Sequence, residues 1–189
     1  VLLGIEVGLQ PRAIEEDRKM VQAHPFDEVV GSMHCFDGLD MYEPTTYDGL
    51  TKDQAVRRYL EDSVRCLERK PDFDSYGHID YISRYMPYPD PNLYYEDHPE
   101  LWDRVFRLLI AGDKALEINT RRLGDDSTIP PLMKLYKRFR ELGGKYATLG
   151  SDAHYKEHVG RDFAKGKQIA DEAGLTLVYY KERKRMLCE

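Results

Sequence analysis

The chain has 189 residues, is 41% hydrophobic and carries a formal net charge of −6 at pH 7, so it can bury a core of its own and is most simply one domain, residues 1–189. The acidic balance argues against a nucleic-acid partner, and no apolar run approaches the roughly 20 residues needed to span a membrane. Three cysteines, an odd number without CxxC spacing, suit a reducing cytoplasm.

Apolar runs of strand length alternate along the chain with segments of helical period. In chain order we expect a strand over 1–9, a helix over 11–23, strands over 27–34 and 75–82 with a helix over 52–69 between them, a helix over 99–111, a strand over 114–120, a helix over 130–142, a strand over 146–152, a helix over 162–173 and a strand over 175–180. Thr51 is the expected N-cap of the second helix. This alternation predicts parallel strands joined by crossover helices.

Two architectures fit such a sheet, an open doubly wound sheet and a closed barrel. Polar residues stand near the carboxyl ends of five separate strand candidates: Glu6, His34, His78, Asn119 and Asp152. All strand ends of a β/α barrel converge on one rim, whereas a doubly wound sheet gathers ligands from fewer strands. We therefore expect a barrel-like sheet. Because the sequence begins inside a strand without Met, we also expect it to be incomplete at its N-terminal side, the C-terminal part of a longer domain.

Each of these polar residues has an ordinary alternative. Glu6 alone would most often be a solvated surface charge, and His34 and His78 could be satisfied core histidines. The set is more informative than its members, because Asp152 and His154 add a second carboxylate and a third imidazole. Carboxylate and imidazole together are ligands of zinc, manganese and iron, so the pattern predicts a divalent metal site.

Five motifs in order, GIEVGLQP, DEVVGSMHCFDG, YGHIDYISRY, ALEINT and TLGSDAHYKEHVGRDF, resemble the PHP (polymerase and histidinol phosphatase) superfamily and its histidinol-phosphatase branch. The resemblance covers nearly the whole chain. It implies a distorted (β/α)7 TIM-like barrel with a trinuclear metal site that hydrolyses phosphomonoesters.

The resemblance also assigns the metal ligands. It implies that Glu6 bridges two metals and that His34 and His78 bind the second. Asp152 would serve the first metal and His154 the third, so that Glu6, Asp152 and His154 are the expected catalytic residues.

One family feature is missing from residues 1–189. Family members open with a His-x-His strand that completes the first and third metal sites, and no such pattern occurs here. We therefore expect up to three Zn, Mn or Fe ions in a complete domain, fewer in this chain, and impaired activity. The edge strand 1–9 is expected to pair with an N-terminal segment or with a second copy of the chain.

The function implied by the resemblance is L-histidinol-phosphate phosphatase of histidine biosynthesis, with water activated by metal for attack on phosphorus. Arg84, Arg121 and Arg122 follow strand ends at the expected rim and are candidates for gripping the phosphate, although at least one could be an ordinary loop arginine. Asp80 and Asn119 could orient the imidazoles. The alternatives are another PHP phosphoesterase or nuclease, and a metal-binding scaffold without activity.

Overall fold

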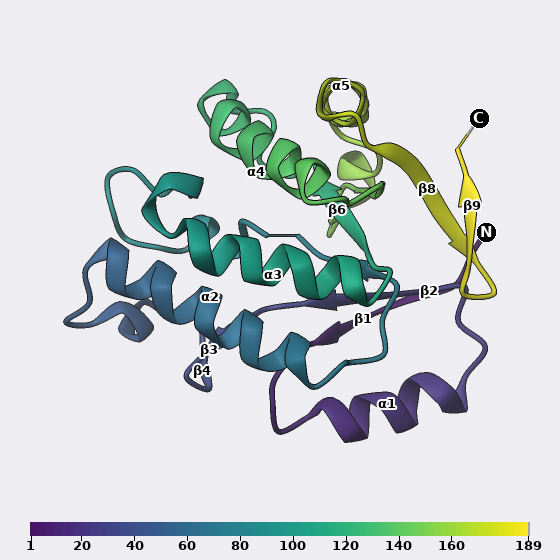
Figure 1. Ribbon diagram of the computed structural model, residues 1–189, viewed down its shortest axis with the longest axis horizontal. Coiled ribbons are helices and arrows are strands. Elements are labelled where there is room, and N and C mark those ends of the chain that lie inside the picture. The colour runs from purple at the N-terminus through teal and green to yellow at the C-terminus, as the bar shows by residue number, and fades with distance from the viewer. Residues whose placement is uncertain (189) are drawn as a thin grey trace.

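The computed structural model describes residues 1–188 and places seven strands in one sheet (Figure 1). Along the sheet these are β1 (Gly4–Gly8), β2 (Glu28–Ser32), β5 (Ser75–Tyr76), β6 (Ala115–Asn119), β7 (Tyr146–Gly150), β8 (Thr176–Lys181) and β9 (Lys184–Leu187). The strands from β1 to β8 pair in parallel, and β9 returns antiparallel to β8. A separate two-stranded ribbon joins β3 (Cys35–Phe36) to β4 (Leu39–Asp40).

The order of the strands decides between the two architectures expected from the sequence. It rises with chain order from β1 to β9 without reversing, whereas a doubly wound sheet reverses at its switch point. The barrel-like winding of an α/β chain is therefore confirmed. Within residues 1–188 no pairing joins β1 to β9, so the barrel is not closed and its two edges are these strands.

The helices connect the strands and pack on one another in the same order. They are α1 (Ile14–Ala23), α2 (Lys52–Glu68), α3 (Pro99–Ala111), α4 (Ile129–Glu141) and α5 (Phe163–Ala173), with α2 on α3, α3 on α4 and α4 on α5 (Figure 1). Thr51 caps α2 as predicted, since its side chain accepts from the backbone N–H of Gln54 while the Gln54 side chain accepts from the Thr51 N–H. None of these helices is long and apolar enough to cross a membrane.

The core lies where these helices cover the sheet. Its largest fully buried side chains include Trp102 and Phe106 of α3, which stack with ring centroids 5.7 Å apart. Phe139 of α4 meets Phe106 edge to face at the same separation. This packing joins α3 to α4 and, through α3, to β6.

One predicted strand is much shorter than expected. Residues 75–82 form only the two-residue β5, because the chain leaves the sheet at Gly77 and turns at His78, whose φ is +36°. A Cβ on Gly77 would lie 2.2 Å from Ser32 Oγ, so glycine is required where the turn passes β2. Strand β9 was not predicted at all.

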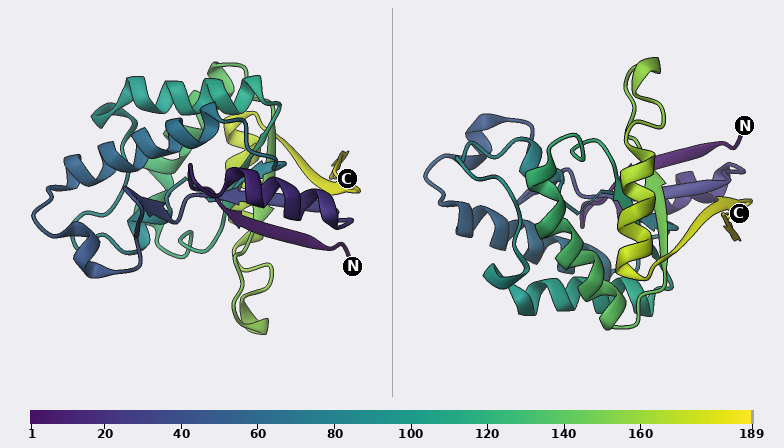
Figure 2. Two further views of the ribbon diagram at one scale, coloured as in Figure 1. Left: turned by 90° about the horizontal axis from the view of Figure 1, so that it is seen from below. Right: turned by 90° about the horizontal axis from the view of Figure 1, so that it is seen from above.

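Apart from Glu6 in β1 and Asn119 in β6, the predicted site residues lie in the loops after the carboxyl ends of the strands. The segment between β7 and α5, residues 151–162, projects from the body in both views of Figure 2. At the opposite end of the sheet, the turn from β8 to β9 docks on the start of β2, where the Arg183 N–H donates to the Asp27 carbonyl at 2.9 Å.

Candidate active site

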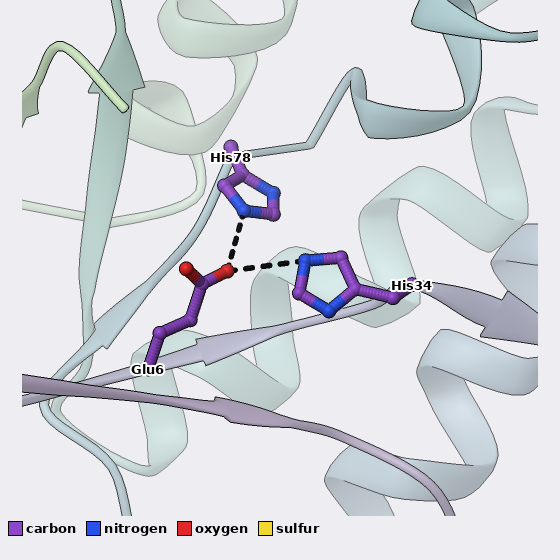
Figure 3. Close-up of side chains that lie close together, drawn as sticks. All are labelled: Glu6, His34 and His78. Atoms are coloured by element: carbon purple, nitrogen blue, oxygen red, sulfur yellow. Dashed lines mark hydrogen bonds and ion pairs between the residues drawn. The ribbon is translucent and has the colours of Figure 1, made fainter. Parts of the chain in front are cut away.

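Three of the predicted metal ligands meet at one carboxylate oxygen. Glu6 projects from β1, His34 follows β2 by two residues and His78 follows β5 by two. The Nε2 atoms of His78 and His34 lie 2.7 Å and 3.1 Å from Glu6 Oε1, as Figure 3 shows. The ligand atoms of all three lie within 4.8 Å of one another. We call these three residues the Glu6 cluster.

Within the Glu6 cluster, the pKa of Glu6 is lowered and the pKa of His78 is raised. Burial alone would raise the pKa of Glu6, but the hydrogen bonds from His34 and His78 and the charge on His78 together hold it well below its usual range. Burial alone would lower the pKa of His78, but its bond to Glu6 and the charges of Glu117 and Glu6 raise it overall. A cation binding between these groups must therefore displace protons.

The donor set of the Glu6 cluster fits a divalent metal. Two imidazoles and one glutamate are a known ligand set of catalytic zinc sites, which keep a further position open. His78 is buried, and its Nδ1 has no hydrogen-bond partner among the described residues. Its positive φ is a strained conformation for a residue with a Cβ, and such strain concentrates at functional sites.

Tyr81 supports the cluster from the side. Its ring stacks on His78 with centroids 5.2 Å apart and meets His34 edge to face at 4.5 Å. The guanidinium carbon of Arg84 stands 5.2 Å from the centroid of the same ring. Tyr81 therefore joins the Glu6 cluster to a second group of polar residues.

This second group, the Asp152 cluster, contains Asp152, His154, Arg84 and Arg121. Asp152 Oδ2 accepts from Arg84 Nη1 and lies 3.3 Å from Arg121 Nη1. His154 Nδ1 lies 3.0 Å from the carbonyl oxygen of Asp152, and a proton on Nδ1 would leave Nε2 with the free lone pair that a metal binds. Asp152 also has a left-handed backbone, with φ of +48°. No described contact joins Asp152 or His154 to the Glu6 cluster directly.

The three candidate arginines are placed differently. Arg84 is nearly buried beside Asp152, and Arg121 is more open. Arg122 turns away: its Nη1 lies 2.8 Å from Asp80 Oδ2 and its Nη2 donates to Asn92 Oδ1 at 3.0 Å. Asp80 thus pairs with an arginine and makes no recorded bond to an imidazole.

Two buried polar residues of β6 complete the rim, and the sequence interpretation overlooked one of them. Asn119 does not bond an imidazole either: its Oδ1 accepts from Arg84 Nη2 at 3.1 Å and its Nδ2 donates to Glu117 Oε2 at 3.1 Å. Burial raises the pKa of Glu117 to about 7, with the charges of His78, Glu6 and Asp152 acting on it as well. The only sequence signal was a lone charge within an apolar run, and the structure shows that all five positions of β6 are buried.

A barrel-like parallel sheet with carboxylates and imidazoles at its strand ends is the arrangement of metal-dependent β/α-barrel enzymes. Comparison with known families agrees, since the PHP domain model matches residues 1–121. The chain belongs to the PHP domain family, and the resemblance seen in its motifs is confirmed.

Relatives with assigned names point to one branch. The chain is 38% identical to a probable histidinol-phosphatase of Clostridium acetobutylicum over 97% of its own length and 72% of the relative. It is 32% identical to the histidinol-phosphatase of Lactococcus lactis subsp. lactis over 92% of its length and 65% of the relative. The chain therefore spans about two thirds to three quarters of these relatives.

A solved structure matches the whole architecture. The histidinol phosphate phosphatase of Lactococcus lactis, in complex with zinc, L-histidinol and phosphate, superposes with a TM-score of 0.87 at 29% identity. The match covers 98% of this chain and 71% of that one.

Proposed function

We propose that this chain is a metal-dependent phosphomonoester hydrolase that acts on L-histidinol phosphate, a step of histidine biosynthesis. The observation that carries the proposal is the Glu6 cluster, in which one carboxylate oxygen lies between two imidazoles at the carboxyl ends of parallel strands. The relatives named histidinol-phosphatases, and the neighbour that binds zinc, L-histidinol and phosphate, support the choice of reaction and substrate.

The chain's own residues divide into two tasks. Glu6, His34, His78, Asp152 and His154 would hold divalent metal, zinc in preference to manganese or iron because the neighbour binds zinc. Bound metal supplies Lewis acidity that activates water for attack on phosphorus and offsets the charge of the phosphoryl oxygens. Glu6, Asp152 and His154 are then the proposed catalytic residues.

Arg84 and Arg121 would position the phosphate. Both present guanidinium groups at Asp152, and a guanidinium can grip two phosphoryl oxygens at once. Tyr81 and Asn119 hold Arg84 in its place. We propose that Arg122, which is engaged by Asp80 and Asn92, supports the loop and does not grip the phosphate.

The described ligands also set the expected metal content. Only one ion obtains three ligands, from the Glu6 cluster, whereas Asp152 and His154 offer one side chain each to any other. Because incomplete sites bind weakly, we propose about one tightly held ion and slow turnover. Residues 1–189 would act as a single domain, and the cytoplasm is the proposed compartment because Cys35, Cys66 and Cys188 are all unpaired thiols.

A small-molecule phosphate ester is the proposed partner, with neither nucleic acid nor membrane. In addition, β1 pairs with β2 on one side and with no other described strand, so its free edge can accept another. We propose that a segment N-terminal to β1, or a second copy of the chain, supplies that strand. Light scattering would show a dimer in the second case.

Substrate comparison tests the function. Chelated protein is reloaded with Zn, Mn or Fe, and phosphate release is followed over long incubations with L-histidinol phosphate, a generic aryl phosphate and single-stranded DNA. We expect metal-dependent release with L-histidinol phosphate preferred, its loss in His34→Ala, and its retention in the matched control His24→Ala, since His24 lies at the end of α1. Metal binding without hydrolysis would indicate a scaffold, and preferred cleavage of DNA would indicate a nuclease.

A further inference from the structure

Glu117 is a buried carboxylate at the rim that the proposed chemistry does not use. It is 7% exposed, and Asn119 Nδ2, at 3.1 Å, is the one hydrogen-bond donor recorded for its side chain in residues 1–188. A buried carboxylate is costly unless it is bonded, so the bond to Asn119 matters to the stability of this part of the rim. The neighbouring strand leaves room for it, because a Cβ on Gly150 would lie 1.8 Å from Glu117 Oε1.

Asn119 connects Glu117 to the arginines of the Asp152 cluster. Its Oδ1 accepts from Arg84 Nη2 at 3.1 Å and from the backbone N–H of Arg121 at 3.0 Å. When Glu117 is ionised, turning the carboxamide over would set Oδ1 against the carboxylate and Nδ2 against the guanidinium, and both contacts would be repulsive. The carboxylate therefore selects one orientation of Asn119, the one that faces its oxygen to the arginines.

Arg84 depends on that oxygen. Its guanidinium is nearly buried and is held by Asp152 through Nη1 and by Asn119 through Nη2, while Nε has no hydrogen-bond partner within residues 1–188. Without the Asn119 contact, the Arg84 guanidinium would be oriented only by one oxygen of Asp152 and by the ring of Tyr81. A guanidinium that can rotate about a single hydrogen bond binds phosphate more weakly, because contact with two phosphoryl oxygens requires a fixed guanidinium plane.

We propose that Glu117 is a positioning residue that locks Asn119 and, through it, holds the Arg84 guanidinium in the phosphate-gripping orientation. This inference rests on the proposed function, in which Arg84 binds the phosphate. Glutamine at position 117 would fill the same volume but could present either oxygen or N–H to Asn119, so only the arginine side would still favour one orientation of the carboxamide and the orientation would be less firmly held.

The experiment compares Glu117→Gln with Glu28→Gln. Glu28 is also largely buried and accepts from a single side chain, Ser75, but it lies at the amino end of β2. For Glu117→Gln we expect the Kd of inorganic phosphate on zinc-loaded protein, and the KM for L-histidinol phosphate, to rise about tenfold with less change in kcat and unchanged metal content. Glu28→Gln should leave both values unchanged. Combined with Arg84→Ala, Glu117→Gln should add no further loss, because both act on one contact.

A second readout does not depend on activity. The side-chain Nδ2 hydrogens of Asn119, followed by NMR, should exchange slowly in the wild type and faster in Glu117→Gln. If Glu117→Gln does not fold, Asn119→Ala should give the same tenfold loss. A phosphate Kd within twofold of wild type, additive losses with Arg84→Ala, or unchanged Asn119 exchange would overturn the inference. A wild type that neither binds nor releases phosphate would instead refute the proposed function and leave the NMR result to decide the role of Glu117.

Discussion

Replacing Gly150 by alanine should destabilise the protein, because the added methyl group would clash with the buried side chain of Glu117. Gly150 ends β7 and pairs in register with Asn119, and an added Cβ would meet Glu117 at 1.8 Å from Oε1 and 2.7 Å from Cδ. Its backbone is not left-handed, so alanine is acceptable there on conformational grounds and the effect is steric. To reach the ordinary contact distance of 3.4 Å, Oε1 must retreat by about 1.6 Å, and this displaces the carboxylate whose other oxygen, Oε2, accepts from Asn119.

The cost follows from this displacement. Overpacking a buried site costs about 1–3 kcal/mol, and the upper half of that range is expected because a carboxylate and its hydrogen bond are both displaced. The stiffer alanine backbone returns about 0.4–1 kcal/mol through the unfolded state. For a chain of this size a net loss of about 1–2 kcal/mol corresponds to a melting temperature lower by about 2–8 °C.

Thermal unfolding followed by circular dichroism measures this loss. Gly4→Ala is the matched control, since its Cβ would come no closer than 3.5 Å to Glu28, and the same backbone effect should raise its melting temperature by about 1–4 °C. In a double-mutant cycle, Glu117→Ala should remove most of the cost of Gly150→Ala, because the clashing group is gone. Equal melting temperatures for Gly150→Ala and wild type, or strict additivity in the cycle, would refute the packing described for Glu117.

Three further outcomes are expected. Zinc at about 100 times its Kd should stabilise the chelated chain by about 2.7 kcal/mol, which raises the melting temperature by roughly 5–11 °C. Glu6→Gln should abolish this increase, and an undiminished increase would place the metal elsewhere. The raised pKa of His78 means that its protonation stabilises the metal-free fold below about pH 6.5, and this stabilisation is lost as the pH rises through the pKa of the folded state. The melting temperature of the metal-free protein should therefore fall from pH 6 to 8, while the increase caused by zinc should become larger. Arg84→Ala should weaken phosphate binding about tenfold to a hundredfold at constant metal content, whereas Arg122→Ala should leave it within about twofold, and equal effects would contradict the assignment of these arginines.

The convergence of Glu6, His34 and His78 could be predicted because it depends only on chain direction. Parallel strands bring their carboxyl ends to one side, and β1, β2 and β5 are adjacent in the sheet, so residues at or just beyond these strand ends lie close together. The boundaries of β5 could not be predicted, because the turn at His78 follows from contacts between Gly77 and Ser32 across the sheet.

The sequence could not predict which of the two adjacent arginines faces the site. Arg121 and Arg122 have the same chemistry and differ by one position, yet one guanidinium reaches Asp152 and the other reaches Asp80. The partner is set by loops distant in sequence, 31 and 42 positions away. The position of Glu117 was equally hidden, since a glutamate in an apolar run can be an outward-facing charge until both faces of the strand are known to be covered.

The Asp152 cluster implies that metal and phosphate bind cooperatively. Arg84 and Arg121 both face Asp152, so a phosphate that takes their guanidinium groups leaves a carboxylate, shielded from solvent, without its counter-charges. A divalent cation at Asp152, held more weakly than the ion of the Glu6 cluster and so present at higher zinc concentration, would replace those charges and free both arginines for the phosphate. Because linkage is reciprocal, zinc should tighten phosphate binding by the same factor by which phosphate tightens zinc binding, about 5- to 150-fold for a typical coupling. Titration calorimetry of each ligand with and without the other measures both factors, and Asp152→Asn should bring them close to one. Equal phosphate affinity in chelated and zinc-loaded wild type would show that Asp152 does not compete for the arginines.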